Sequence, residues 1–243
     1  CEDNLGNIWI GTFNGLNRYN KSTGLFQNHT ANDIQTDGLT HSSIWCIVKD
    51  NQGTLWLGTY FGGVNYFNPE YEIYTRYSYS SNEKKGLSNP VVGRTIEDKN
   101  GNLWIGTEGG GLNYYNRRTR EFKWYRPQEG RNSISHNNVK ALYYDADKEI
   151  IWIGTHLGGL NKLDIRSGHF THYRMEGNNP QSLPSDIIRD ITPYKDLLII
   201  ATQNGVCLFN PANGQCRQLF KDSKEGKSIK MVADVVFDSE GTL

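Results

Sequence analysis

The sequence predicts an all-β protein made of repeated four-stranded antiparallel sheets. A four-residue word, Trp-x-Gly-Thr, begins at Trp9, Trp56, Trp104 and Trp152, and a degenerate copy begins at Ile199. The copies are 47 or 48 residues apart, and each interval contains four short strand-like segments. No segment of useful length has the period of a helix. Repeats of four antiparallel strands at this spacing are typical of the blades of a β-propeller.

Each repeat opens with an apolar strand that runs into a tight turn. In most repeats the turn reads Asp-x-x-Gly, where glycine supplies the positive φ that a tight hairpin requires. The predicted first strands are Ile44 to Lys49, Val92 to Glu97, Val139 to Tyr144, Ile187 to Thr192 and Val232 to Phe237.

The other three strands follow in a constant order. The second strand is the Trp-x-Gly-Thr word, and the third is an Asn-aromatic segment after a Gly-rich turn. The fourth is rich in aromatic residues, as at Phe122 to Tyr125 and Phe170 to Tyr173. The tryptophan offers a large apolar face to fill the space between neighbouring blades, and the glycine two places later leaves room for close approach. The word is therefore predicted to serve packing.

The repeats predict one propeller domain over residues 1–243, with about five blades. The expected units are strands two to four of one blade in 1–37, complete blades in 38–85, 86–132, 133–181 and 182–227, and an orphan first strand in 228–243. Two arrangements stay open: a closed five-bladed ring, in which the orphan strand pairs with the strand around Trp9, and an arc of a seven-bladed parent. The chain has no initiating methionine, so we expect it to be a piece of a longer protein.

Composition disfavours several classes of partner. The chain has 26 basic and 26 acidic side chains, whereas nucleic-acid binding depends on clustered Lys and Arg. No apolar run approaches the about 18 residues that cross a bilayer, so a membrane contact is expected only through another part of a longer protein. The histidines show no HExxH spacing, and we expect no metal and no cofactor.

The extended pattern resembles the two-component regulator propeller repeat. It reads Asp-x-x-Gly-Asn-Leu-Trp-Ile-Gly-Thr-x-x-Gly-Gly-Leu-Asn-x-Tyr-Asn, followed by a Ser-Leu-Ser-like stretch at Gly86 to Ser88, Ser133 to Ser135 and Ser182 to Pro184. The resemblance covers essentially the whole chain. The fifth repeat departs most, since it lacks the tryptophan, Ala201 replaces the glycine and Pro193 replaces the turn aspartate.

This resemblance implies the periplasmic sensor region of a hybrid two-component system from a polysaccharide-degrading bacterium. Such a region binds oligosaccharides released by polysaccharide breakdown and passes the signal across the inner membrane to a histidine kinase. The implied partners are an oligosaccharide and a neighbouring propeller or second protomer, in a homodimer. The segment itself is then a sensor and not an enzyme.

Positions that vary between the repeats are the candidate ligand site, because loops vary on a constant scaffold. The residues that follow the Thr of each word form one column: Phe13, Tyr60, Glu108, His156 and Gln203. Aromatic members would stack on sugar faces, and polar members would bind sugar hydroxyls.

A second varying column lies inside the first strands. It reads Cys46, Arg94, Ala141, Arg189 and Asp234, with Trp45 and Lys140 in the adjoining column. Arg94 and Arg189 would face a polar channel or bind the carboxylate of an acidic sugar. The predicted binding face combines the first column with Trp45, Arg94, Lys140 and Arg189, although solvated turns and charge pairs explain any single member equally well.

Three further alternatives stay open. Cys207 and Cys216 flank one predicted hairpin diagonally, so they are either bridged or free. A propeller lyase or hydrolase of the streptogramin-lyase type would need an acid/base pair, which Glu108 and His156 in adjacent blades suggest. A pure protein-interaction scaffold would use Tyr60 and His156 for association instead of small-molecule binding.

Overall fold

The computed structural model describes residues 1–31, 38–69, 73–220 and 231–237. These residues form β-strands and one short 3-10 turn, η1 (Glu83–Lys85). Among them no helix is long and apolar enough to cross a membrane. The predicted all-β fold is confirmed.

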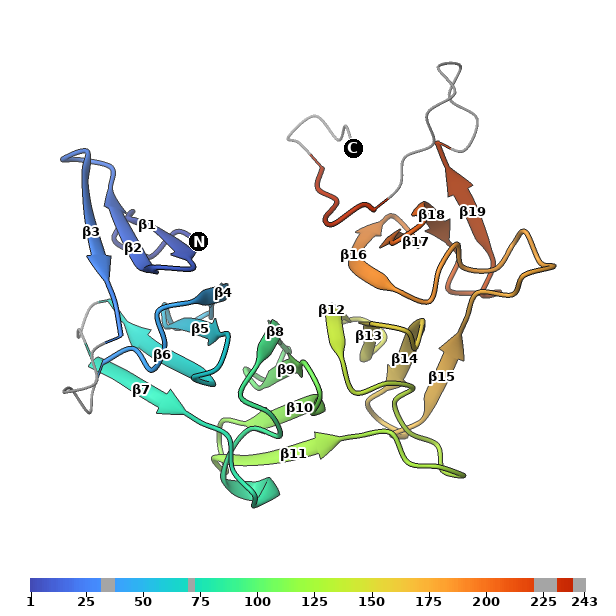
Figure 1. The fold of residues 1–243 in the computed structure, drawn as a ribbon, viewed down its shortest axis with the longest axis horizontal. Helices are drawn as coiled ribbons and strands as arrows, with labels where there is room; N and C mark the ends of the chain where they lie inside the picture. The colour runs from blue at the N-terminus through green and yellow to red at the C-terminus, as the bar shows by residue number, and fades with distance from the viewer. Residues whose placement is uncertain (32–37, 70–72, 221–230, 238–243) are drawn as a thin grey trace. The chain divides into compact units, whose positions relative to one another are not determined.

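The chain folds into two compact units, and the first unit spans Cys1–Tyr125. It contains three antiparallel sheets in which consecutive strands pair (Figure 1). The sheets are β1 (Ile8–Thr12), β2 (Gly15–Asn20) and β3 (Leu25–His29); β4 (Ile44–Lys49), β5 (Leu55–Thr59), β6 (Val64–Asn68) and β7 (Ile73–Tyr77); and β8 (Val92–Glu97), β9 (Leu103–Thr107), β10 (Gly111–Asn116) and β11 (Glu121–Tyr125).

The second unit spans Arg126–Leu243 and contains two four-stranded sheets of the same design. They are β12 (Val139–Asp145), β13 (Ile150–Thr155), β14 (Leu160–Asp164) and β15 (Phe170–Tyr173); and β16 (Ile188–Tyr194), β17 (Leu197–Thr202), β18 (Gly205–Phe209) and β19 (Cys216–Leu219). These sheets are the blades of a β-propeller, as predicted. Strands β4 and β8 have the predicted bounds, and β12 ends one residue later than predicted. Strand β16 begins one residue later, at Ile188, and ends two residues later.

The predicted strand from Val232 to Phe237 is wrong, because this segment belongs to no sheet. It lies against β16 instead, where the hydroxyl of Thr192 donates to the carbonyl of Val235 over 2.9 Å. The other first strands pair with the second strand of their own sheet, and no second strand follows this segment among the described residues. The rest of the expected unit, residues 228–230 and 238–243, lies outside the described residues.

A buried hydrogen bond ties the Asp-x-x-Gly turn to the tryptophan six residues later. The indole N–H of Trp56 donates to Oδ2 of Asp50 over 2.8 Å. The other carboxylate oxygen accepts the backbone N–H groups of Gln52 and Thr54. The same side-chain bond joins Trp9 to Asp3 at 2.7 Å and Trp104 to Asp98 at 3.2 Å. The recurring aspartate therefore binds the tryptophan as well as shaping the turn.

The tryptophans fill the space between neighbouring sheets, as predicted. Trp9 of the first sheet packs edge-on against Phe67 of the second, with ring centroids 5.0 Å apart. The glycine of the word permits this approach: a Cβ atom on Gly58 would lie 2.7 Å from Cγ1 of Val92 in the next sheet. Each hydrophobic core of a unit therefore lies between two sheets.

Asparagines of the third strands hold the loops that lead into the first strands. The backbone N–H of Ser88 donates to Oδ1 of Asn113 over 2.8 Å, and the amide of Asn113 donates back to the hydroxyl of Ser88. Ser135 and Asn161 form the same backbone bond in the second unit. Two of the Ser-Leu-Ser-like stretches, Gly86 to Ser88 and Ser133 to Ser135, are thus anchored by these asparagines, whereas Cys207 stands at the equivalent position of the fifth repeat.

A β-bulge near the start of the first strand marks equivalent positions in four sheets. The ladder skips one residue in each of four sheets, and the skipped residues are Trp45, Gly93, Lys140 and Arg189. Arg189 therefore shares its place with Trp45 and Lys140, whereas Asp190 occupies the place of Cys46 and Arg94. The predicted alignment of Arg189 with Cys46 is wrong, because the hairpin after β16 is one residue shorter: Thr192 pairs with Ile199, whereas Val48 pairs with Trp56.

Replacing Asp98 by alanine should destabilise the protein by about 2 to 3 kcal/mol, because the buried indole of Trp104 and two turn N–H groups lose a charged acceptor. Urea unfolding followed by tryptophan fluorescence measures the change. The fold should survive, since the fourth repeat carries Ala146 six residues before its tryptophan. Asp147→Ala at an exposed turn position is the control, with an expected change under about 0.5 kcal/mol. Equal stabilities of the two variants would contradict the prediction.

The diagonal placement of Cys207 and Cys216 is confirmed. The register pairs Cys207 with Gln218 and Cys216 with Phe209, and the two sulfur atoms lie 3.1 Å apart as free, buried thiols. The hydrogen bond with Cys216, together with burial, raises the pKa of the Cys207 thiol well above its ordinary value.

Iodoacetamide at pH 8 should therefore alkylate Cys207 far more slowly than the exposed Cys1. The raised pKa leaves little thiolate at this pH, and the thiolate is the reactive form. Mass spectrometry of timed digests measures both rates, and denaturation in urea should make them similar. Equal rates in the native protein would show that the Cys207 thiol is not shielded from the reagent and that its pKa is not raised.

Candidate functional site

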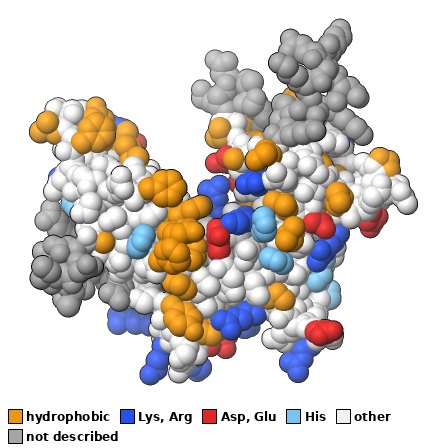
Figure 2. Space-filling model, in the orientation of Figure 1, with side chains coloured by type: hydrophobic (Ala, Val, Ile, Leu, Met, Phe, Trp, Pro, Cys, Tyr) orange, Lys and Arg blue, Asp and Glu red, His pale blue; other side chains and the backbone are white. Residues whose placement is uncertain are grey.

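Three of the predicted aromatic residues form one cluster in the first unit. The rings of Trp45 and Tyr60 stack with centroids 5.4 Å apart and an interplanar angle of 15°, and Phe13 packs edge-on against Trp45 at 6.2 Å. Phe13 is 75% exposed and Trp45 is 46% exposed. Figure 2 shows hydrophobic side chains gathered on this part of the unit. The sequence prediction thus selected residues that lie together.

A repeated backbone bond explains why the first column lies at one end of the sheets. The residue after the Thr of the word donates its N–H to the carbonyl of the residue just before the first strand of the same sheet. The pairs are Tyr60 with Ser43, Glu108 with Val91, His156 with Asn138 and Gln203 with Ile187, at 2.9 to 3.0 Å. The column therefore stands where the second strand ends, opposite the Asp-x-x-Gly turn.

The cluster also contains two residues that the sequence analysis missed. Phe61 is 58% exposed and packs edge-on against Tyr60 at 4.3 Å. His41 lies 6.0 Å from Phe61, and its Nδ1 accepts the backbone N–H of Ser43. Phe61 could have been found from the sequence, because the second position after the Thr also varies between the repeats. It reads Asn14, Phe61, Gly109, Leu157 and Asn204. The signal for His41 was its place just before a first strand.

Arg94 reaches the same region from the third sheet. It lines a pocket of about 440 Å³ together with Trp45, Cys46 and Thr95. Trp45 also lines an adjoining pocket of about 270 Å³ with Phe13. An arginine beside exposed aromatic rings can bind an anionic or hydroxyl group of a ligand that stacks on them. Glu108 of the same unit is half-buried at the end of β9.

In the second unit, Arg189 and Gln203 lie together. The guanidinium of Arg189 donates through Nε to Oε1 of Gln203 over 3.2 Å and through Nη2 to the same oxygen. Lys140 is half-buried at the equivalent bulge of the neighbouring sheet. This part of the predicted face therefore carries polar and cationic groups, in contrast to the aromatic cluster of the first unit.

His156 lies near a histidine that the sequence analysis did not select. Burial lowers the pKa of His136, and the charges of the nearby His156 and Arg174 lower it further. The Nδ1 atom of His136 accepts the backbone N–H of Asn138 over 3.1 Å. His136 is thus kept neutral at pH 7, as an anchored turn residue. The acid/base pair of Glu108 and His156 stays a prediction, since the two residues belong to different units.

Three segments of the chain match a known family model. Residues 38–61, 86–109 and 133–156 match the model of the two component regulator propeller. No curated protein matches the chain.

Several solved structures share the fold. The extracellular domain assigned to the hybrid two component system BT3049 from B. thetaiotaomicron has a TM-score of 0.76 and 21% identity, over 89% of this chain and 29% of that one. The extracellular domain of BT4673 from the same organism has a TM-score of 0.58 and 22% identity, over 99% of this chain and 39% of that one. PorZ is a surface component of the type-IX secretion system of Porphyromonas gingivalis. Its structure has a TM-score of 0.66 and 19% identity, over 92% of this chain and 33% of that one.

At these identities the likeness shows the fold, and the chain spans 29% to 39% of the length of these relatives. The match to the family model lies in the repeats themselves. Three of them match the family model, and the turn, the tryptophan word and the strand order recur in the sheets around them. The chain therefore contains repeats that match the two component regulator propeller.

Proposed function

We propose that this chain is the ligand-sensing propeller of an extracytoplasmic sensor and that it binds oligosaccharides on the aromatic cluster of the first unit. The parent is then a periplasmic hybrid two-component signalling protein whose histidine kinase lies outside these residues. The module itself is non-enzymatic. Its matched repeats support this role, and two of its structural relatives are extracellular domains assigned to two-component or one-component systems.

The observation that carries the proposal is the exposed aromatic cluster of Phe13, Trp45, Tyr60 and Phe61. Exposed apolar side chains in contact with one another mark binding sites more often than single ones do. The stacked pair of Trp45 and Tyr60 offers a flat apolar surface of the kind that the C–H face of a sugar ring covers, and the hydroxyl of Tyr60 can bind a sugar hydroxyl.

Polar groups around the cluster would supply orientation. Arg94 shares a pocket with Trp45, and His41 lies beside Phe61. A ligand that binds one arrangement of the sensor better than another shifts the equilibrium between them by its difference in affinity. The signal would then pass through contact with a neighbouring propeller or a second protomer.

Replacing Trp45 by alanine should weaken oligosaccharide binding about tenfold, because a loss near 1.4 kcal/mol of stacking corresponds to that factor. Isothermal titration with plant, host and microbial oligosaccharides first identifies a class that gives saturable heat, and the same titration is then repeated with Trp45→Ala and Tyr60→Ala. Phe26→Ala is the matched control, because Phe26 is also exposed in the first unit but lies on β3.

The control should bind as the unchanged protein does. Two outcomes would contradict binding on the aromatic cluster: no saturable heat with any oligosaccharide of the panel, or an affinity that Trp45→Ala and Phe26→Ala reduce equally. Release of shortened products from a polysaccharide, abolished by Glu108→Gln, would favour a propeller lyase or hydrolase instead.

A further inference from the structure

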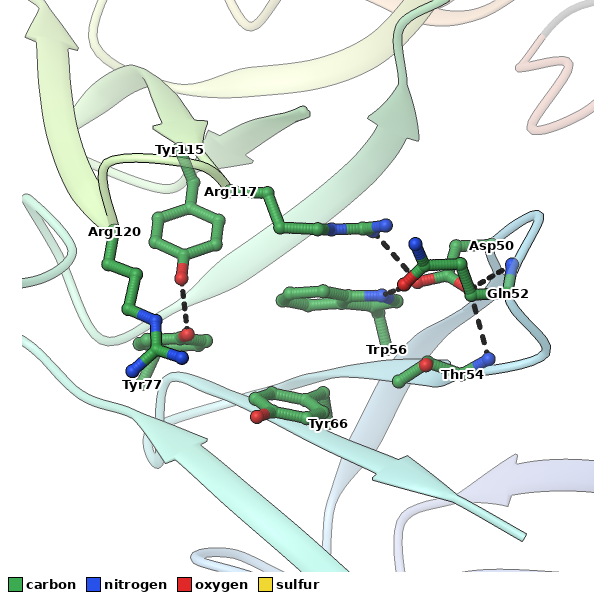
Figure 3. A pocket seen from close by; sticks show the side chains of 9 residues that line it. All are labelled: Asp50, Gln52, Thr54, Trp56, Tyr66, Tyr77, Tyr115, Arg117 and Arg120. Atoms are coloured by element: carbon green, nitrogen blue, oxygen red, sulfur yellow. Dashed lines mark hydrogen bonds and ion pairs between the residues drawn. The ribbon is translucent and has the colours of Figure 1, made fainter. Parts of the chain in front are cut away.

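A pocket of about 440 Å³ opens at the other end of the first unit, beside the Asp-x-x-Gly turn of the second sheet. Figure 3 shows the side chains that line it. They are Asp50, Gln52, Thr54, Trp56, Tyr66 and Tyr77 from the second sheet and Tyr115, Arg117 and Arg120 from the third. None of these residues belongs to the aromatic cluster described above.

One wall of this pocket consists of nearly parallel rings. Trp56 and Tyr77 are stacked with centroids 6.1 Å apart and an interplanar angle of 5°, and Tyr66 stacks on Tyr77 at 5.8 Å. The hydroxyls of Tyr77 and Tyr115 form a hydrogen bond of 2.5 Å. Burial, and then the bond to Tyr115, raises the pKa of Tyr77, so the phenol of Tyr77 stays neutral. One hydroxyl donates in the bond between the two phenols, which leaves the other O–H group for a ligand. A flat ring fits such a wall.

Two arginines border the pocket, and their charges are balanced differently. Arg117 donates to Oδ2 of Asp50 over 2.7 Å, lies 3.4 Å from a carboxylate oxygen of Glu97, and stands 5.3 Å from the ring of Trp56. Arg120 has no ion pair or hydrogen bond through its side chain in the part of the chain that the structure describes. Figure 3 shows its guanidinium directed toward Tyr77. The pocket therefore offers one uncompensated cation beside the aromatic wall.

The backbone of Arg120 makes this side chain unusual. Its φ is 59°, in the left-handed region, and its N–H donates to the carbonyl four residues earlier. Three other repeats build the same turn with glycine: Gly24, Gly168 and Gly214, with φ of 71°, 71° and 76°. Left-handed backbone is unfavourable for a side chain with a Cβ atom, so arginine is a costly choice where glycine suffices.

The equivalent place in the second unit shows what the arginines replace. There Pro211 and Gly214 stand at the positions of Arg117 and Arg120, and Phe209 stands at that of Tyr115. The turn packs directly on the aromatic wall, since a Cβ atom on Gly214 would lie 2.7 Å from Cε1 of Tyr173. The blade scaffold therefore forms without an arginine at either of these two turn positions.

We propose that this pocket binds a ligand with a carboxylate on a six-membered ring, the ring lying on Trp56, Tyr66 and Tyr77 and the carboxylate on Arg120. A guanidinium binds a carboxylate through two parallel N–H donors, and the phenols of Tyr77 and Tyr115 supply further polar contacts. The shared chemistry fits two sources, an acidic sugar and an aromatic acid. This site is separate from the aromatic cluster and does not depend on the function proposed for it.

Isothermal titration of the whole chain with galacturonate, benzoate and galactose tests the proposal. Saturable heat is expected with galacturonate or with benzoate, and which of the two binds identifies an acidic sugar or an aromatic acid. Galactose, which lacks the carboxylate, should bind at least tenfold more weakly. Absence of saturable heat with both acids, or equal binding of galactose and galacturonate, would overturn the proposal.

Arg120→Gly is the decisive variant, because it restores the residue that three other repeats carry and should leave the melting temperature unchanged or raised. It should weaken binding of the acid at least tenfold. Arg118→Ala, on the same turn, is the matched control and should bind as the unchanged protein does. The double variant Trp45→Ala, Tyr60→Ala should also keep this binding. Unchanged affinity in Arg120→Gly, or loss in the double variant, would assign the acid to another site.

Discussion

The packing of the second-strand tryptophan against the neighbouring sheet is the interaction on which the rest of this structure depends. A four-stranded sheet has two faces, and it can bury them only against other sheets. Trp9 and Trp152 each contact an aromatic ring of the next blade, at 5.0 and 5.4 Å. Truncating such a side chain typically costs roughly 3 to 5 kcal/mol, more than any single polar contact in the repeat. The cores between sheets are therefore the main source of stability.

Placing an indole there creates a second requirement, since its N–H must find an acceptor when buried. The turn aspartate meets this need in three repeats while it also caps the hairpin. The glycine of the word meets a related need, because it removes the side chain that would collide with the next blade. The Trp-x-Gly-Thr word and the Asp-x-x-Gly turn thus act together in packing one sheet against the next.

Because these residues stabilise the packing between sheets, the residues at both ends of the sheets can vary. At one end the position after the Thr carries Phe13, Tyr60 and Glu108 in the first unit and His156 and Gln203 in the second. At the other end the turn between the third and fourth strands is glycine-based in three repeats and carries Arg120 in another. The departures from the repeat, rather than the repeat itself, thus hold the chemistry that a ligand would meet.

The sequence by itself determined the blade architecture, the order of the strands and the residues of the core. These features are local and periodic: hydrophobic alternation and turn residues act over a few positions and recur every 47 or 48 residues. It also selected Phe13, Trp45 and Tyr60, because their columns place them at one end of neighbouring sheets.

Only the tertiary structure decided what depends on register and on contacts between sheets. Strand pairing moved Arg189 out of its predicted column, because the hairpin after β16 is one residue shorter than the hairpin after β4. The segment from Val232 to Phe237 did not form a strand, since a strand needs a partner that sequence patterns do not supply. The pocket of Trp56, Tyr77 and Arg120 was invisible to repeat analysis, because its walls come from two blades that meet only when the sheets pack together.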